Sequence, residues 1–548
     1  MRSPCRYFLI LLLCTLLAVP MGTAAEADAN NAQAAKLTGR ISMSQLPPPS
    51  NDTTPGSWFL GATPPNYDPN KPPIVFVQGM NGRAQDWWDE TMYHGLNDMY
   101  EKAYSHGYRT AFVQLYDAAG QGSASQWDNG RLLAYMLEQI YHRFGQKVNI
   151  VAHSKGGPDT QAALIHYGAY RFVGKVVTLG SPHHGSHLAD LAHSWYAGWL
   201  AELLGIQSPG TYSLQTGEMA KFREVTDSHA NVGQNAYYTA AGTSWGPFPS
   251  ALWTGGLYLS PHGPNDGLVN EWSTRLRYGS HLFTDDVDHD MIRTGSASFS
   301  RIEPVLRTSR AAGAAPKAMA PPSEAVAVPQ ADEQYVYGAA LHARQTVEHQ
   351  VPVDSSSREA LFTIMTRSPD AEVILISPSG GHYSKAGKEY LAAVDRGLFA
   401  GAYVQAFRIQ QPQRGVWKVR ITSPRDDAFL LTTTFVGSST LSVDLPLTSK
   451  QKDFAFKVKL RNPAHFDPSS LQVRLKGVTP REKAGRLTNS ARFQQQLKMD
   501  SKQLGAFVGK ISTGLKPGAY NLTIEIKGKT KRGEPFARTV VRSVHIDN

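Results

Sequence analysis

Cysteine is almost absent from this sequence: of 548 residues, only Cys5 and Cys14 are cysteines, and both lie close to the N-terminus. The first 25 residues carry Arg2 and Arg6, continue with the apolar run 8–19 and end in small residues. This pattern is typical of a secretory signal peptide. We therefore expect a secreted, extracellular mature chain without cysteine, which excludes disulfides and thiol chemistry.

Long apolar runs are also missing after this leader, so we expect no transmembrane segment in the mature chain. The formal net charge is +10, and residues 450–548 hold 21 Lys and Arg against 7 Asp and Glu. A basic face can attract anionic polymers or a cell envelope, although it is more simply a solvated face. No nucleic-acid motif accompanies it, so no nucleic-acid partner is expected.

The composition and the pattern of apolar residues change twice along the sequence. Short apolar runs alternate with segments of helical periodicity up to about residue 309, which predicts an α/β fold with a mostly parallel sheet and helices on both faces. An Ala/Pro-rich segment without aromatics follows, and then short alternating strands predict two all-β sandwich modules. The expected boundaries are a signal peptide 1–25, a lead-in 26–73, an α/β domain 74–309, a linker 310–334, a β-module 335–444 and a basic immunoglobulin-like β-module 445–548.

Individual elements of the α/β domain can be predicted from periodicity and from turn residues. We expect strands over 74–79, 108–116 and 147–152 and helices over 131–145 and 159–170, with further strands in the runs GKVVTLGS and AYYTAAGT.

The stretch AHSKGG, Ala152–Gly157, places a serine where a strand ends and a helix begins. A serine hydroxyl attacks only if a base removes its proton, and a tight turn with small neighbours lifts it clear of the backbone. The turn therefore indicates Ser154 as a nucleophile. The backbone amide of Lys155 would then face a developing oxyanion, and the turn after VFVQG offers the amide of Met80 as a second donor.

A base and an acid are expected further along the chain, in the order Ser, Asp, His. The run HGPNDGLVN supplies Asp266 in a turn, and DDVDHDMIRTG supplies His289 in a loop after a strand. Alternatives stay open at this point. The acid could instead be one of the carboxylates 285, 286 and 288, and the pair His183-His184 is a competing base, interpreted as a loop that lines the site.

Two groups of aromatic residues are candidates for substrate binding. Trp87 and Trp88 follow the proposed oxyanion turn and are candidates for lining an acyl pocket. Trp195 and Trp199 lie at helical spacing in the segment 187–205, which is either a cap that offers an apolar surface to lipid or a helix packed on the core.

Residues from Ile74 to about Leu306 resemble the α/β-hydrolase lipases and esterases of bacteria. AHSKGG is similar to the AHSMGG turn of that family, GSPHHGS to its GSPHxGS, and NDGLV and DHDMIRTG to the segments of its catalytic acid and histidine. The resemblance implies Ser154 as nucleophile, Asp266 as acid, His289 as base, and Met80 and Lys155 as oxyanion donors. Some relatives hold calcium or zinc, but we identify no ligand set and expect no metal and no cofactor.

The expected function is a secreted serine hydrolase that cleaves lipid-like carboxylic esters through an acyl-enzyme. The alternatives are an extracellular polyhydroxyalkanoate depolymerase, or a catalytically idle adhesion or binding protein whose β-modules carry the binding function. A peptidase or amidase stays open, because the same residues serve several acyl substrates. The β-modules are expected either to contact a polymer or the cell envelope or to act as spacers.

Overall fold

The structure, a computed structural model, describes residues 46–547 apart from 121, 249, 310–333, 396, 438–440, 452, 484–485 and 513–516. The described residues from Pro48 onward form one compact unit. The predicted signal peptide, the first part of the lead-in and nearly all of the predicted linker lie outside the described residues. Within the described residues, no helix has the length and apolarity to cross a membrane.

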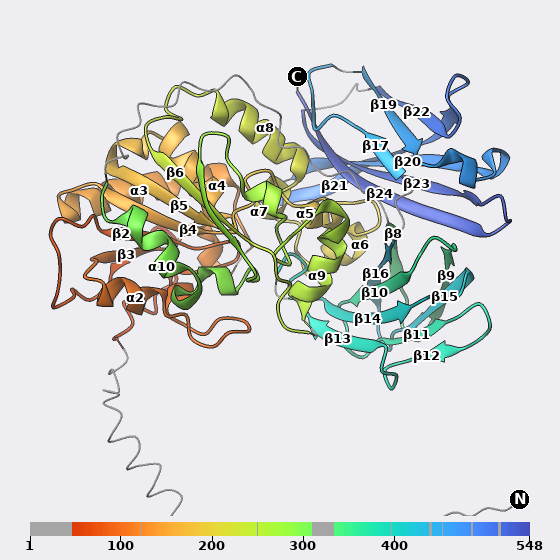
Figure 1. The fold of residues 1–548 in the computed structure, drawn as a ribbon, viewed down its shortest axis with the longest axis horizontal. Helices are drawn as coiled ribbons and strands as arrows, with labels where there is room; N and C mark the ends of the chain where they lie inside the picture. Colours follow the sequence, from red (N-terminus) through yellow and green to blue (C-terminus); the bar gives the residue numbers. More distant parts are fainter. Residues whose placement is uncertain are drawn as a thin grey trace, which may run out of the picture. The chain divides into compact units, whose positions relative to one another are not determined.

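A seven-stranded sheet forms the centre of the α/β domain (Figure 1), in the order β1-β3-β2-β4-β5-β6-β7. All neighbours pair in parallel except β1, which pairs antiparallel with β3. This edge strand lies within the predicted lead-in 26–73. The strands are β1 (Trp58–Leu60), β2 (Ile74–Val77), β3 (Thr110–Val113), β4 (Val148–His153), β5 (Val173–Leu179), β6 (Ala236–Gly242) and β7 (Ser280–Asp285).

Helices cover both faces of this sheet, because its central strands are apolar on both sides. Val75 and Val77 of β2 belong to one apolar cluster with α3, whereas Phe76 points to the other face and stacks on Phe112 and Trp87. The helices are α2 (Met99–Ser105), α3 (Gln126–Phe144), α4 (Gly156–Gln161), α5 (His187–Ala192), α6 (Gly198–Leu204), α7 (Pro209–Ser213), α8 (Thr216–Asp227), α9 (Ala251–Leu259) and α10 (Gly295–Leu306).

Two helices differ in length from the sequence prediction. α3 begins at Gln126, five residues earlier than the periodicity indicates, because the hydroxyl of Ser125 caps the helix by accepting the N–H of Asp128 at 3.2 Å. It ends as predicted before Gly145. The expected helix over 159–170 begins at Gly156 and continues beyond α4 as a π-helical stretch, Ala162–His166.

The segment 187–205 is not one helix but two, α5 and α6, with five residues between them. The hydroxyl of Ser194 lies in this break and accepts the N–H of Ala197 at 3.3 Å. A serine side chain that bonds nearby backbone groups competes with the helical ladder, and the apolar spacing alone does not reveal it.

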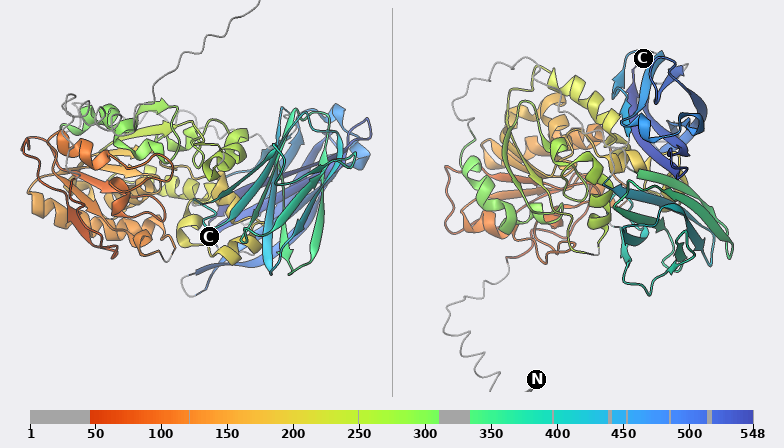
Figure 2. Two further views of the ribbon diagram at one scale, coloured as in Figure 1. Left: turned by 90° about the horizontal axis from the view of Figure 1, so that it is seen from below. Right: turned by 45° about the vertical axis from the view of Figure 1, so that its right-hand side comes forward.

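The described residues after the linker form β-sheets, with two short 3-10 helices at Pro463–His465 and Pro468–Ser470. In the first β-module, a five-stranded sheet β13-β14-β10-β16-β8 packs on a four-stranded sheet β12-β11-β15-β9. In the second, eight strands follow one hydrogen-bonded order, β17-β19-β22-β21-β20-β23-β24-β18, around one apolar core. Figure 2 shows the two groups of strands in teal and blue. β17 lies before residue 445 but pairs with β19, so by pairing it belongs to the second group.

The strands of the first β-module are β8 (Gln334–Leu341), β9 (Thr346–Val353), β10 (Glu359–Thr366), β11 (Glu372–Ile376), β12 (His382–Tyr383), β13 (Tyr390–Val394), β14 (Tyr403–Gln410), β15 (Gly415–Thr422) and β16 (Asp427–Val436). Those of the second are β17 (Leu441–Asp444), β18 (Thr448–Ser449), β19 (Asp453–Leu460), β20 (Gln472–Lys483), β21 (Arg486–Met499), β22 (Ala506–Ser512), β23 (Gly518–Lys529) and β24 (Pro535–Ile546).

Candidate active site

The turn after β4 holds Ser154 in a conformation that few residues adopt. Its φ is 53°, in the left-handed region, where a non-glycine residue is uncommon and is often found at functional sites. Its N–H donates to the carbonyl of Leu179 on β5 at 2.9 Å. Gly156 begins α4 directly afterwards, and a Cβ there would lie 2.5 Å from the carbonyl oxygen of Gln78. The sheet therefore presents the serine at the carboxyl end of its central strands.

Three predicted side chains meet at this turn. Nε2 of His289 lies 2.9 Å from Oγ of Ser154, and Nδ1 of His289 lies 2.8 Å from Oδ2 of Asp266. The other carboxylate oxygen of Asp266 accepts the backbone N–H groups of Leu268 and Val269 at 3.1 and 2.8 Å. The three side chains are enclosed, because Ser154, His289 and Asp266 are 9%, 5% and 0% exposed.

The alternative acids lie elsewhere. Oδ2 of Asp288 contacts Nε2 of His94 at 2.7 Å, and its Oδ1 accepts the N–H groups of residues 290 and 291. Asp285 pairs with Arg301 at 3.1 Å, and Asp286 is exposed. Of the four candidate carboxylates, Asp266 is the one that contacts His289.

The competing base pair is engaged in other contacts. The ring nitrogens of His183 contact Thr178 and Gln161, both at 3.1 Å, and Nε2 of His184 contacts the carbonyl of Arg275 at 3.0 Å. Burial lowers the pKa of His183 well below its ordinary value and that of His184 to about 4. Both are therefore neutral and structural in this arrangement.

The two predicted oxyanion donors lie on either side of the serine. A Cβ at Gly79 would lie only 2.9 Å from the Cβ of Ser154, so the turn after β2 passes directly beside this serine. Among the described residues, the backbone N–H groups of Met80 and Lys155 donate to no acceptor. Unpaired N–H groups beside an enclosed serine are the geometry that stabilises an oxyanion.

The predicted tryptophans are placed differently. Trp87 is buried against Phe76, and Trp88 meets Phe112 edge-on at 4.9 Å between ring centroids. Trp87 is thus part of the core, whereas Trp88 is half-buried. On the far side, Trp195 lies under the guanidinium of Arg492, 4.9 Å from its ring centroid, and Trp199 lies under the same group at 5.4 Å. All four rings thus contact other side chains, and Trp199 is also 45% exposed.

Sequence reasoning missed two further features of the site. His153 donates from Nε2 to the carbonyl of His289 at 2.9 Å, and burial lowers its pKa well below the ordinary value, so it is neutral. The side chain of Lys155 is fully buried and pairs with Asp159 at 2.9 Å. The spacing of four residues between Lys155 and Asp159 is a signal for this pair. Among the described residues, no group of three or more His, Cys, Asp or Glu is arranged to hold a metal ion.

Comparison with known proteins identifies the family to which this fold belongs. No family model matches the chain. The crystal structure of a lipase from Bacillus licheniformis in propeptide form is 34% identical, with a TM-score of 0.73, over 90% of this chain and 98% of that chain. The chain belongs to the α/β-hydrolase lipases and esterases, and the fold class predicted from the sequence is confirmed.

Curated relatives match a shorter part of the chain. Triacylglycerol lipases from Pseudarthrobacter phenanthrenivorans and Burkholderia plantarii are each 31% identical over 135 residues, which is 23% of this chain. These residues cover 37% and 33% of the two relatives, so the chain spans about a third of the length of the curated relatives that it matches.

Proposed function

We propose that this protein hydrolyses carboxylic esters of the lipid type through an acyl-enzyme on Ser154. The observation that carries the proposal is the continuous contact from Oγ of Ser154 through the imidazole of His289 to the carboxylate of Asp266. An ester is the substrate class because the related proteins are named lipases.

The geometry supports a two-step reaction. Nε2 of His289 takes the proton of Ser154 as Oγ attacks the ester carbonyl, and it then returns that proton to the leaving alcohol. The carboxylate of Asp266 accepts a hydrogen bond from Nδ1–H, which holds the imidazole in the required tautomer and stabilises its cation. The N–H groups of Met80 and Lys155 receive the oxyanion. Water then repeats the sequence and releases the acid from the serine.

The test compares esters of increasing chain length. Initial rates on p-nitrophenyl esters from acetate to palmitate, on emulsified triglyceride and on polyhydroxybutyrate particles are expected to show ester cleavage, together with labelling by a fluorophosphonate. Ser154→Ala is expected to abolish both. Clearing of particles with little triglyceride activity would favour the depolymerase, and no cleavage and no labelling would leave the binding-protein alternative.

Secretion is part of the proposal, on the basis of the leader sequence 1–25. Sequencing the N-terminus of protein recovered from the culture medium is expected to start near Glu26. A chain that stays inside the cell with Met1 or Arg2 at its N-terminus would contradict it.

A second proposal concerns the β-modules, which we assign as a cover over the helices around the site. α5 and α8 pack against β24, and α6 packs against β8 and β16. One apolar cluster joins Leu188 and Leu200 of these helices to Phe399 and Val541 of the β-modules. The matching Bacillus structure is described as a propeptide form, which supports assigning the modules to a removable part.

Polar contacts strengthen this cover. Asp190 is fully buried and accepts the hydroxyl of Ser543 at 2.7 Å, and Asn521 donates to the carbonyl of Asp190 at 2.6 Å. Lys476 contacts the hydroxyl of Tyr196 at 2.6 Å and pairs with Glu525 at 2.8 Å. Buried contacts of this kind favour a cover over freely tethered modules that bind a polymer or the cell envelope.

A specific protease site inserted within 310–333 tests the cover. Cleavage and separation of the two parts are expected to raise the rates on long esters and on emulsions above those of the intact chain. Unchanged soluble-ester rates with a loss of activity on particles would instead support polymer binding by the modules. The same cleaved and intact samples are used for the ester series above, so that a closed cover is not mistaken for an inactive site.

A further inference from the structure

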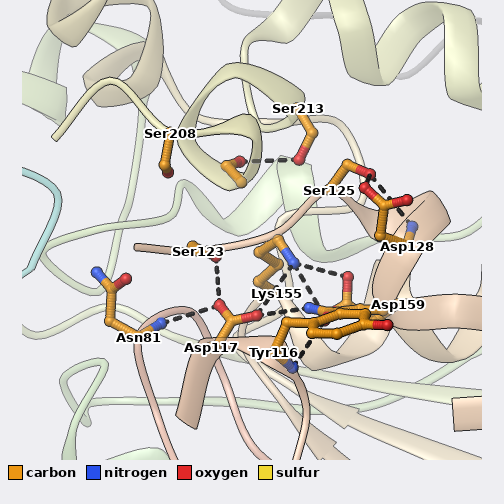
Figure 3. A network of polar contacts seen from close by, with 12 residues as sticks. Asn81, Tyr116, Asp117, Ser123, Ser125, Asp128, Lys155, Asp159, Ser208 and Ser213 are labelled. Carbon is orange, nitrogen blue, oxygen red and sulfur yellow. Dashed lines mark hydrogen bonds and ion pairs between the residues drawn. The ribbon is translucent and has the colours of Figure 1, made fainter. Parts of the chain in front are cut away.

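A buried polar cluster surrounds the side chain of Lys155, the residue that follows Ser154 (Figure 3). Nζ of Lys155 is 2.9 and 3.0 Å from the two carboxylate oxygens of Asp159 and 4.0 Å from Oδ2 of Asp117. The amide of Asn129 donates to both carboxylates, at 2.6 Å to Asp117 and 2.9 Å to Asp159. All four side chains are buried, and charges are buried at this depth only when they are paired and hydrogen-bonded.

One carboxylate of this cluster reaches the oxyanion turn. Oδ1 of Asp117, in the turn η2 (Tyr116–Ala119) after β3, accepts the backbone N–H of Asn81 at 3.1 Å and the hydroxyl of Ser123. Asn81 follows the oxyanion donor Met80 and has a φ of 56°. Because the peptide between residues 80 and 81 is planar, fixing its N–H restrains the backbone rotation at Met80.

The same cluster also contains the other donor. Lys155 supplies a backbone N–H to the oxyanion site, while its ammonium lies between Asp117 and Asp159. The peptide that follows Met80 and the side chain of Lys155 are thus both bonded to one buried set of charges. Such a restraint requires that the carboxylate of Asp117 is itself fixed in place. The hydroxyl of Ser123 and the amide of Asn129 both donate hydrogen bonds to this carboxylate.

We propose that Asp117 is a positioning residue for the oxyanion site, which fixes the Met80–Asn81 peptide so that the N–H of Met80 converges with that of Lys155. The ammonium of Lys155 lies against both carboxylates of the cluster and offsets their negative charge. The inference rests on the proposed ester hydrolysis, and it assigns to Asp117 no contact with substrate.

The variant Asp117→Asn tests this role with little change of shape, and it leaves Lys155 and Asp159 as a balanced pair. Either orientation of the new amide turns its NH₂ toward a donor, on the Asn81 side or on the Asn129 side. We expect kcat on p-nitrophenyl butyrate to fall about 10-fold to 100-fold, part of the ~10²–10³-fold that loss of one oxyanion donor costs. KM is expected to stay within about twofold, because the ground-state ester makes no use of the donor.

A pair of inhibitors separates positioning from general damage. A trifluoromethyl ketone adds to the serine and forms an oxyanion, so its Ki is expected to rise by the same factor as kcat falls. The matching ether forms no oxyanion, and its Ki is expected to stay constant. Asp128→Asn is the control, since Asp128 lies in the same region but contacts Ser125 and not Asn81, and all its constants should match the wild type.

Several results would overturn the inference. The inference is wrong if Asp117→Asn folds and its kcat and its Ki for the ketone are both unchanged. It is also wrong if the variant loses affinity for the ketone and for the ether by the same factor. If Asp117→Asn does not fold, Ser123→Ala is the second variant, because it removes a hydroxyl that donates to Oδ1 of Asp117. It is expected to lower kcat and ketone affinity about threefold, and no change in either overturns the inference. A wild type that neither cleaves the ester nor binds the ketone contradicts the proposed function and this inference together.

Discussion

His289 and Asp266 are joined twice. The imidazole Nδ1 of His289 lies 2.8 Å from Oδ2 of Asp266, and the backbone N–H of His289 donates to the carbonyl of Asp266 at 2.9 Å. The second bond ties the loop after β7 to the turn that carries the acid, 23 residues earlier. The side-chain contact is therefore set by the backbone as well as by the attraction of the two groups.

This relationship predicts the effect of Asp266→Asn. The backbone bond survives, so the loops should keep their places, but the amide favours the wrong imidazole tautomer. We expect kcat on p-nitrophenyl butyrate to fall by about 10⁴-fold, as in other serine triads. The melting temperature should change by only a few degrees, because the substitution conserves shape.

Asp285→Asn is the matched control, because Asp285 pairs with Arg301 rather than with His289. Its rate is expected to lie within about twofold of the wild type, as for a surface ion pair of little energetic weight. If Asp266→Asn kept most of its activity while Asp285→Asn lost it, the assignment of the acid would have to be exchanged.

Much of the candidate site could be predicted from local signals. Ser154, Asp266 and His289 each stand in a short run whose turn residues and chain order are visible in the sequence. Asp117 could not be predicted in this way, because its role depends on contacts with residues 81, 123 and 129 that only the folded chain brings together. A role of the tryptophans in substrate binding stays a prediction, because position in the chain does not tell which face of a turn an aromatic ring occupies.

Gly79→Ala is predicted to damage the site without unfolding the sheet. The added Cβ would lie 2.9 Å from the Cβ of Ser154 and 3.2 Å from Nδ1 of His153, closer than such atoms approach. The turn or the serine must shift, and a shift of this size misplaces the oxyanion donors. We expect kcat to fall about 100-fold or more, measured on p-nitrophenyl butyrate.

Gly145→Ala is the control for Gly79→Ala, because an added Cβ at Gly145 contacts nothing. Gly145 ends α3 with a φ of 67°, and no atom lies within 4 Å of the position of an added Cβ. The substitution should cost about 1 kcal/mol of stability through backbone strain and leave kcat unchanged. Full activity in Gly79→Ala would show that the turn after β2 does not form part of the site.

The layers of the fold could be predicted from the sequence, but the break within a helical segment and the contacts between distant segments could not. Continuous apolar runs gave the central strands, since β2, β4 and β5 are buried along their whole length. Apolar spacing did not reveal the break between α5 and α6, where a serine hydroxyl competes with the helix. Nor could it predict that these helices pack against strands more than a hundred residues further along the chain.

Tyr196→Phe is predicted to loosen the proposed cover. It removes the hydroxyl that contacts Glu525 and Lys476 and keeps the ring in its apolar cluster. Losing a hydrogen bond to charged groups costs about 1.5–3 kcal/mol. We expect the intact chain to cleave long esters several-fold faster, with faster amide hydrogen exchange in α6.

Tyr335→Phe serves as the control for this change, because its hydroxyl contacts His349 within the first β-module at 2.8 Å. It should leave both the rate and the exchange of α6 unaltered. Equal rates for Tyr196→Phe and the wild type, despite faster exchange, would show that this contact does not limit access to the serine.

The buried carboxylate of Asp159 predicts a dependence of stability on pH. Burial is the main cause that raises its pKa, to about 7, and the neighbouring carboxylate of Asp117 adds to this, while Lys155 and Asn129 act in the opposite direction. The protonated form is thus favoured in the folded state. Its stabilising contribution is present below about pH 4 and is lost as the pH rises through 7, by at most about 1.4 kcal/mol per pH unit.

Asp159→Asn cannot titrate, so this loss should disappear. Melting temperatures of variant and wild type, measured by scanning fluorimetry from pH 5 to pH 8, are expected to shift in favour of the variant as the pH rises. Asp128→Asn should run parallel to the wild type, because Asp128 lies outside the buried cluster. If Asp159→Asn also ran parallel, Asp159 would be charged throughout this range, and the single ammonium of Lys155 would face two charged carboxylates.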